Sequence, residues 1–202
     1  MDSERFNQLS MILTENLGPD LIQIVYELDE ITLHVYPGSI VRTLTILSNH
    51  RTCNFKQLID ITAVDYPSRL KRFEVVYHLL SLSENIRLRV KVAVQEGASV
   101  PTCTHVYACA NWYEREIWDL FGITFADHND LRRILTDYNF SGHPLRKDFP
   151  LSGYTQVRYC DKEARVIYEP IHLQQEYRTF DFLSPWEGMV TGKDVRSIES
   201  KD

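Results

Sequence analysis

The stretch IRLRVKVAV, residues 86–94, constrains the fold of this 202-residue chain more than any other. Apolar residues at every second position alternate there with Arg87, Arg89 and Lys91. Successive side chains of a β-strand point to opposite faces, so this pattern predicts a strand with one buried face and one wet face. Such a strand belongs in a sheet that is covered on one side.

The same periodicities predict the other elements of the fold. Helices are expected over residues 6–17, from Ser39 as an N-cap, and through much of 104–138. Strands are expected near 22–26, 31–35, 54–65 and 72–82. Because most neighbouring strands should be antiparallel, the predicted fold class is α+β, a two-layer domain with a mostly antiparallel sheet covered by helices.

The character of the chain changes after residue 138. SGHPLRKDFPLSGY, residues 141–154, holds two prolines and two glycines without a regular period, which predicts an extended segment. Residues 157–170 predict a small hairpin, and aromatic residues follow at Tyr177, Phe180, Phe182 and Trp186. We therefore expect an α+β core over 1–138 and an extended C-terminal docking segment over 139–202, which packs on the core and on partners.

Composition excludes several classes of function. The formal net charge of -6 argues against nucleic acid as a partner, because phosphate binding requires a basic surface. The longest apolar runs are too short to span a bilayer, and the N-terminus resembles neither a signal peptide nor a transit peptide. The cysteines lack C-x-x-C spacing, which predicts reduced thiols rather than cluster or zinc ligands: Cys53, Cys103, Cys109 and Cys160.

The segment WYEREIWDLFGI, residues 112–123, places four charged residues among aromatic ones. On a helical wheel Glu116 falls inside the apolar arc, and Glu114 lies near its other edge. Arg115 and Asp119 lie on the opposite side, four residues apart, where they can form an ion pair. A carboxylate among aromatic side chains requires a partner or a proton, so Glu116 should be paired.

Three interpretations of this helix compete. In the first, Glu116 forms a buried ion pair with Arg132 or Arg133 and ties two helices together. In the second, Glu114, Glu116 and Asp119 form an acidic active site with shifted pKa values.

The third interpretation, a metal site, lacks the usual ligand spacing. The nearest downstream histidine, His128, lies twelve residues past Glu116, and His143 lies in a proline-containing stretch without a ligand partner. The sequence also contains no nucleophile elbow, P-loop or dinucleotide-binding glycine pattern.

One combination of residues is specific enough to indicate a family. E-R-E-I-W-D-L-F, then six residues, His128, three residues and R-R-I-L resembles the signature of the thirty-kilodalton hydrophilic-arm subunit of respiratory complex I. DITAVDYPSRLKRFEVVYHLLS, DLRRILTDYNFSGHPLRKDFPLSGY and YRTFDFLSPWE are similar to its mitochondrial branch. The resemblance covers roughly residues 55–187, and Asn139 replaces an expected glycine.

The resemblance implies a structural role, without a catalytic or redox centre in this chain. The complex passes electrons from NADH through flavin and iron–sulfur clusters to ubiquinone and pumps protons, but members of this family hold none of these centres. This chain should pack against the large quinone-site subunit and near the iron–sulfur subunits. The matching residues carry over as structural and interface residues, with no catalytic, cofactor or metal residue expected: Glu114, Arg115, Glu116, Asp119, His128, Arg132 and Arg133.

The resemblance also implies a location, a peripheral position on the matrix side of the mitochondrial inner membrane, with a bacterial membrane as the fallback. Two alternatives remain open. One is a stand-alone enzyme that uses Glu114, Glu116 and Asp119. The other is the equivalent subunit of a membrane-bound hydrogenase or a plastid-type dehydrogenase.

Overall fold

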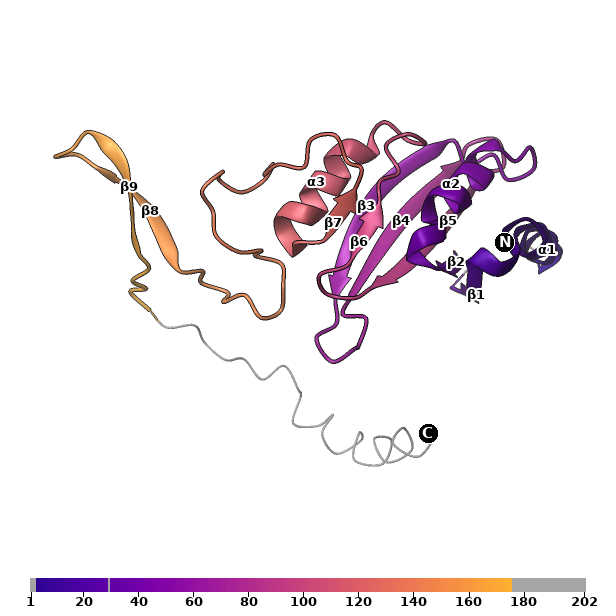
Figure 1. Cartoon of the computed structure of the whole chain (residues 1–202), viewed down its shortest axis with the longest axis horizontal. Helices are drawn as coiled ribbons and strands as arrows, with labels where there is room; N and C mark the ends of the chain where they lie inside the picture. Colours follow the sequence, from indigo (N-terminus) through magenta and orange to yellow (C-terminus); the bar gives the residue numbers. More distant parts are fainter. Residues whose placement is uncertain (1–2, 29, 176–202) are drawn as a thin grey trace, which may run out of the picture. The chain divides into compact units, whose positions relative to one another are not determined.

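A five-stranded sheet forms the centre of the protein (Figure 1), whose computed structural model describes residues 3–28 and 30–175. The strand order is β1-β2-β5-β4-β3. The strands are β1 (Leu21–Glu27), β2 (Glu30–Val35), β3 (Gln57–Asp65), β4 (Phe73–Ser81) and β5 (Ile86–Val94). Within this sheet β2 and β5 pair in parallel and the other neighbours are antiparallel, so the predicted, mostly antiparallel α+β fold is confirmed.

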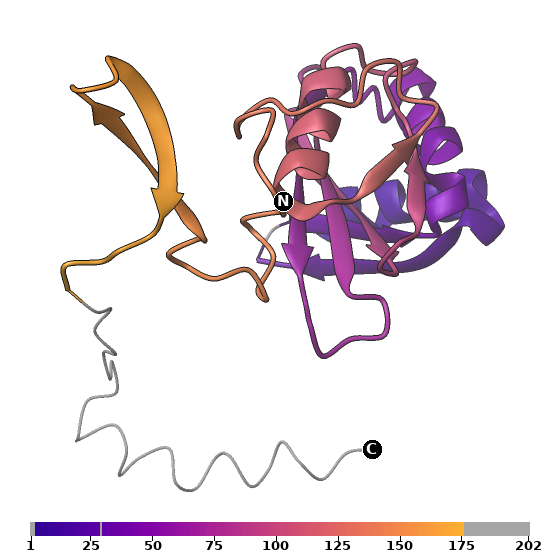
Figure 2. The ribbon, with the colours of Figure 1, turned by 60° about the vertical axis from the view of Figure 1, so that its left-hand side comes forward.

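Helices cover one face of this sheet. They are α1 (Ser3–Leu17), α2 (Ile40–Asn49) and α3 (Ala110–Phe121), with short 3₁₀ turns at Gly18–Asp20 and Pro37–Ser39. Figures 1 and 2 show α2 and α3 over the same face. The predicted alternation of β5 is confirmed, because Val90 and Val92 are fully buried in one core with Leu44 of α2 and Ile117 of α3. Burial of this apolar surface is the main driving force for folding.

Two details of the helix predictions are wrong. Ser39 precedes α2 but does not cap it, because its hydroxyl donates to Asp20 Oδ1 at 2.7 Å instead of accepting from the helix. Helical structure does not continue to residue 138: a short strand, β7 (Thr124–Ala126), follows α3 and pairs with β6 (Ser99–Pro101). Residues 127–153 then run without helix or strand.

The structure divides the chain after Gly153, into units Met1–Gly153 and Tyr154–Asp202, whereas the sequence suggested a boundary at 138. Residues 143–146 hydrogen-bond to the end of α3, which places this stretch with the first unit. In the second unit, β8 (Thr155–Cys160) and β9 (Arg165–Pro170) form the expected hairpin.

The aromatic residues at 177, 180, 182 and 186 lie outside the described residues. No helix within 3–28 or 30–175 has the length and apolar character needed to cross a membrane.

Gly122 ends α3 in the left-handed conformation, with φ +75, and its N–H donates to the carbonyl oxygen of Trp118 at 2.9 Å. A Cβ here would lie 2.6 Å from side-chain atoms of both His143 and Arg146. Two constraints therefore require glycine at this position: a backbone conformation that L side chains rarely adopt and a close approach of the following segment.

Gly122→Ala should lower the free energy of unfolding more than Gly97→Ala does. Gly97 has φ +79, and a Cβ there meets nothing within 4 Å, so both variants carry similar backbone strain and only Gly122→Ala adds the clash. Urea unfolding of the full chain measures the difference. Equal shifts of the two midpoints would contradict the close packing of 143–146 on the helix end.

Candidate functional site: the charged helix and the segment it holds

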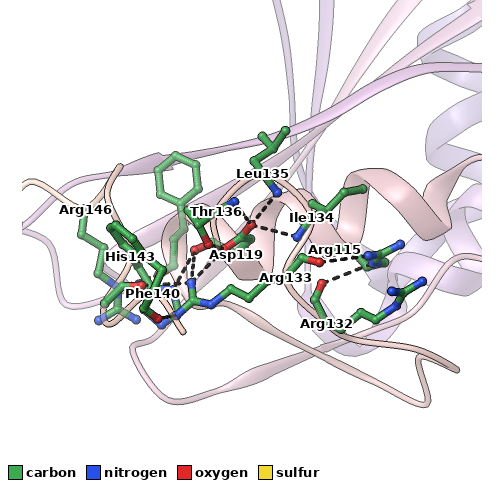
Figure 3. A network of polar contacts seen from close by, with 12 residues as sticks. Arg115, Asp119, Arg132, Arg133, Ile134, Leu135, Thr136, Phe140, His143 and Arg146 are labelled. Atoms are coloured by element: carbon green, nitrogen blue, oxygen red, sulfur yellow. Dashed lines mark hydrogen bonds and ion pairs between the residues drawn. The ribbon is translucent and has the colours of Figure 1, made fainter. Parts of the chain in front are cut away.

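Asp119, in the last turn of α3, is a fully buried carboxylate that accepts five hydrogen bonds (Figure 3). Its Oδ2 accepts the backbone N–H groups of Ile134, Leu135 and Thr136 at 2.8–3.0 Å. Its Oδ1 accepts from the Thr136 hydroxyl at 2.5 Å and from Arg133 Nη1 at 2.8 Å. One side chain of the helix therefore organises the turn at 133–136.

These contacts hold the Asp119 side chain in its charged form. Burial alone would raise the pKa of this carboxyl, but hydrogen bonds from Thr136 and Arg133 and from backbone N–H groups lower it further than burial raises it. The net pKa lies well below the usual range for aspartate. A group that is held ionised and saturated with donors stabilises structure and is unsuited to acid–base exchange near neutral pH.

The end of α3 is closed by the chain that follows it. A helix leaves its last carbonyl oxygens without intrahelical partners. Here the stretch 143–146 supplies the donors. The pairs are His143 Nδ1 with the carbonyl of Asp119 at 2.9 Å, the Leu145 N–H with Leu120 at 3.0 Å, and Arg146 Nε with Phe121 at 2.5 Å. The 143–146 stretch thus serves as the C-terminal cap of the helix.

Arg133 links α3 to the chain at residues 140–142. Besides Asp119, its guanidinium donates to the carbonyl oxygens of Gly142 at 3.0 Å and Phe140 at 2.8 Å. The same group lies 5.4 Å from the ring centroid of Trp118, close enough for a cation–π interaction. A planar group with five N–H donors suits this cross-linking role, which a lysine ammonium could not reproduce.

Arg115 and Asp119, expected to pair across one helical turn, pair with other groups, so that prediction is wrong. The buried Arg115 donates to the carbonyl oxygens of Arg132 at 3.2 Å and Arg133 at 3.1 Å, as Figure 3 shows. The Arg132 side chain is exposed and forms a surface ion pair with Asp130 at 2.8 Å. Of the three arginines, Arg115 and Arg133 therefore hold backbone in place.

Glu114 is the second fully buried carboxylate of α3. Its oxygens accept from the Thr102 hydroxyl at 2.5 Å and from the Cys103 N–H at 2.8 Å. His128 Nε2 lies 3.8 Å away, too far for a hydrogen bond, and instead contacts the carbonyl of Asn111 at 3.1 Å. Glu114 thus fixes the loop before α3, as Asp119 fixes the segment after it.

The expectation that Glu116 is the buried, arginine-paired carboxylate is wrong. Glu116 is half-buried, and no ion pair joins it to Arg132 or Arg133 within the described part of the chain. Burial, and then the nearby charge of Asp60, raise the pKa of Glu116. The helical wheel misassigned the buried face, because Trp112 of the apolar arc is 69% exposed while Glu114 is buried.

A second charged network was not predicted. Arg72 forms a bidentate pair with the buried Asp65, at 2.7 and 2.9 Å, which lowers the pKa of that carboxyl. Asp65 Oδ2 also accepts the N–H of Lys147 at 2.8 Å. The remaining pairs of the network are Arg72 with Glu96, Arg72 with Asp148, and Arg146 with Glu96. Charges at the end of β3 and just before β4 were the available sequence signal.

Within 3–28 and 30–175, no group of three or more His, Cys, Asp or Glu residues is placed to hold a metal ion. Cys53 and Cys103 are buried, and burial raises the pKa of both thiols, that of Cys53 to about 11. A pocket of about 270 Å³ lies on the sheet, where His78, Arg87 and Arg89 contribute to its lining, and not at Glu114 or Asp119.

Comparisons with known proteins agree on one family. Residues 33–155 match the family model described as "Respiratory-chain NADH dehydrogenase, 30 Kd subunit". The chain is 57% identical over 180 residues to an NADH-quinone oxidoreductase subunit of Methylobacterium sp. (strain 4-46), an alignment that covers 89% of this chain and 84% of the relative. Identity is 52% over 186 residues to the same subunit of Chelativorans sp. (strain BNC1), covering 92% of this chain and 93% of the relative.

A solved structure shares the fold. The chain superposes on one chain of the membrane-bound sulfane sulfur reductase, described as an archaeal respiratory membrane complex, with a TM-score of 0.63 and 28% identity. The match covers 73% of this chain and 86% of the archaeal one.

Asp119→Asn should destabilise the full chain by roughly 3 kcal/mol at pH 7, because it leaves the Arg133 charge without its buried partner. The pKa of Asp119 is lower in the folded than in the unfolded chain, so its charge stabilises the fold above about pH 4, and this contribution is lost as pH falls further. The difference between wild type and variant should therefore narrow below about pH 4.

Urea unfolding at several pH values measures this difference. Asp130→Asn is the control, because that carboxylate forms an exposed ion pair, and it should change stability little. A difference between wild type and Asp119→Asn that stays constant from pH 7 to pH 2 would contradict the assignment of a charged Asp119.

Proposed function

Because the chain belongs to the family of the 30 kDa subunit of respiratory-chain NADH dehydrogenase, we propose that it is a non-redox structural subunit of the peripheral arm of complex I. In that role it supports electron transfer from NADH to ubiquinone, coupled to proton translocation, by holding other subunits in place. The flavin and the iron–sulfur clusters belong to those other subunits.

The observation that carries this proposal is the saturation of the buried charges of α3. Glu114 and Asp119 accept hydrogen bonds from the chain itself, and Arg115 and Arg133 donate to it. An active site built on these carboxylates would require them to be accessible to substrate, and they are enclosed by structural partners. Their chemistry suits a rigid platform.

The partners that fit this role are the large hydrophilic subunit of the quinone site and the iron–sulfur subunits of the peripheral arm. Support comes from the relatives, which are subunits of NADH-quinone oxidoreductase, and from the archaeal neighbour, which belongs to a respiratory membrane complex. The chain would then reach the membrane through its partners.

The alternative of an acidic enzyme is disfavoured by the same geometry. It requires at least two of Glu114, Glu116 and Asp119 to share a cleft. Instead, Glu114 binds the loop before α3, Asp119 binds the segment after it, and Glu116 lies half-buried near Asp60.

Sequence identity distinguishes complex I from the alternative of a hydrogenase-type subunit. The chain is 52–57% identical to two NADH-quinone oxidoreductase subunits and 28% identical to the archaeal reductase chain. This difference favours complex I.

The location follows from the proposed complex. As a peripheral-arm subunit, the chain would lie at the surface of the membrane that carries the respiratory chain. The matrix side of the mitochondrial inner membrane remains a sequence-based prediction, because the relatives compared above are bacterial.

A pull-down of the tagged full chain from native membranes in mild detergent tests the proposed function. We expect the quinone-site and iron–sulfur subunits in the eluate, together with NADH dehydrogenase activity. Recovery of the chain alone, or with catalytic activity of its own, would overturn the proposal.

For Glu116→Ala we expect less assembled complex with unchanged turnover per complex. The described residues provide no ion-pair partner for this half-buried carboxylate, so a cationic side chain of a neighbouring subunit would supply one. Native gels measure assembly, and NADH:quinone activity normalised to complex measures turnover. Glu15→Ala, at an exposed carboxylate of α1, is the control. Normal assembly with sharply reduced turnover would instead indicate a catalytic Glu116.

A further inference from the structure

The β8–β9 hairpin presents one apolar face. The register pairs Val157 with Tyr168 and Tyr159 with Val166, and paired residues of neighbouring strands project to the same side. All four side chains are more than half exposed, between 54% and 62%. Four adjacent apolar side chains on a ribbon this small form an exposed patch of the kind that marks an interaction surface.

The opposite face carries paired polar side chains, together with Cys160 and Ile167, which lies across from Arg158. Gln156 Nε2 donates to Glu169 Oε1 at 2.7 Å, and Arg158 Nε donates to the same oxygen at 3.2 Å. On this face Gln156, Ile167 and Glu169 are half-buried, whereas the four apolar side chains of the first face are exposed. The hairpin is therefore an amphipathic ribbon whose exposed apolar side chains gather on one face.

The charges of the hairpin indicate which partner fits this face. Residues 155–170 contain three basic and three acidic side chains, so the ribbon has no net charge to attract an anionic bilayer or a nucleic acid. Arg158 and Arg165 are each neutralised within the hairpin, by Glu169 and Glu163. The surface complementary to the apolar face is therefore an uncharged, apolar protein surface.

The hairpin also lies where the family model ends. The matched region stops at residue 155, whereas the alignment with the Chelativorans relative covers too much of the chain to omit residues 155–170. A two-stranded hairpin is at best marginally stable in water without further packing. Packing against a neighbouring protein would supply the missing support.

We propose that the face formed by Val157, Tyr159, Val166 and Tyr168 docks on an uncharged apolar surface of a neighbouring subunit of the complex. This inference rests on the proposed function and adds to it the residues that make the contact. Tyrosine suits such a contact, because its ring contributes a large apolar area.

Site-specific photo-crosslinking in the assembled complex tests the face. Tyr159→p-benzoylphenylalanine places the probe on the apolar face, and Arg158→p-benzoylphenylalanine places it on the adjacent, opposite-facing position of the same strand. Val157→p-benzoylphenylalanine is a second probe of the apolar face. Each full-length variant is irradiated within the complex after native purification, and mass spectrometry identifies the linked peptides.

We expect at least a fivefold higher yield of links to another subunit from positions 157 and 159 than from 158, with the linked peptides apolar and uncharged. Equal yields from both faces, links only within this chain, or links to lipid would overturn the docking proposal while the complex is intact. Failure of the wild-type chain to purify with an NADH-oxidising complex would instead overturn the proposed function, and this is measured before irradiation.

Discussion

The carboxylate of Asp119 is the interaction on which the second half of the domain depends. Three consecutive backbone N–H groups, one hydroxyl and one guanidinium converge on its two oxygens. Backbone N–H groups that are shielded from water require acceptors, and residues 127–153 form neither helix nor strand to supply them. The Asp119 carboxylate therefore supplies the acceptors for this segment that neighbouring strands supply in the sheet.

The other charged groups extend this anchoring in both directions. Glu114 holds the loop before α3, and the Asp65–Arg72 pair binds Lys147 at the far end of the segment. α3 packs on the sheet, and its side chains hydrogen-bond to the irregular chain on either side of the helix. These contacts fix a long stretch of irregular chain to the core. A rigid surface made of loops is suited to recognising other proteins, which is consistent with the role proposed for this protein.

Sequence patterns predicted the layers well, because they depend on local periodicity. The alternation in 86–94 identified the buried face of β5, and residues 157–170 identified the hairpin. The buried side of α3 could not be predicted in this way, since it depends on hydrogen-bond donors from two other parts of the chain: residues 102–103 before the helix bind Glu114, and residues 133–136 after it bind Asp119. The helical wheel therefore selected Glu116 where the fold buries Glu114, and it paired Arg115 with Asp119 where each has a backbone partner.

Hydrogen exchange at the N–H groups of Ile134, Leu135 and Thr136 in the full-length chain tests the central claim most directly. These groups lie outside regular structure and donate to the Asp119 carboxylate. The account predicts that they exchange as slowly as the N–H groups of α3. Exchange at the rate of an exposed loop, while α3 remains protected, would show that the carboxylate does not hold the segment and would contradict the account.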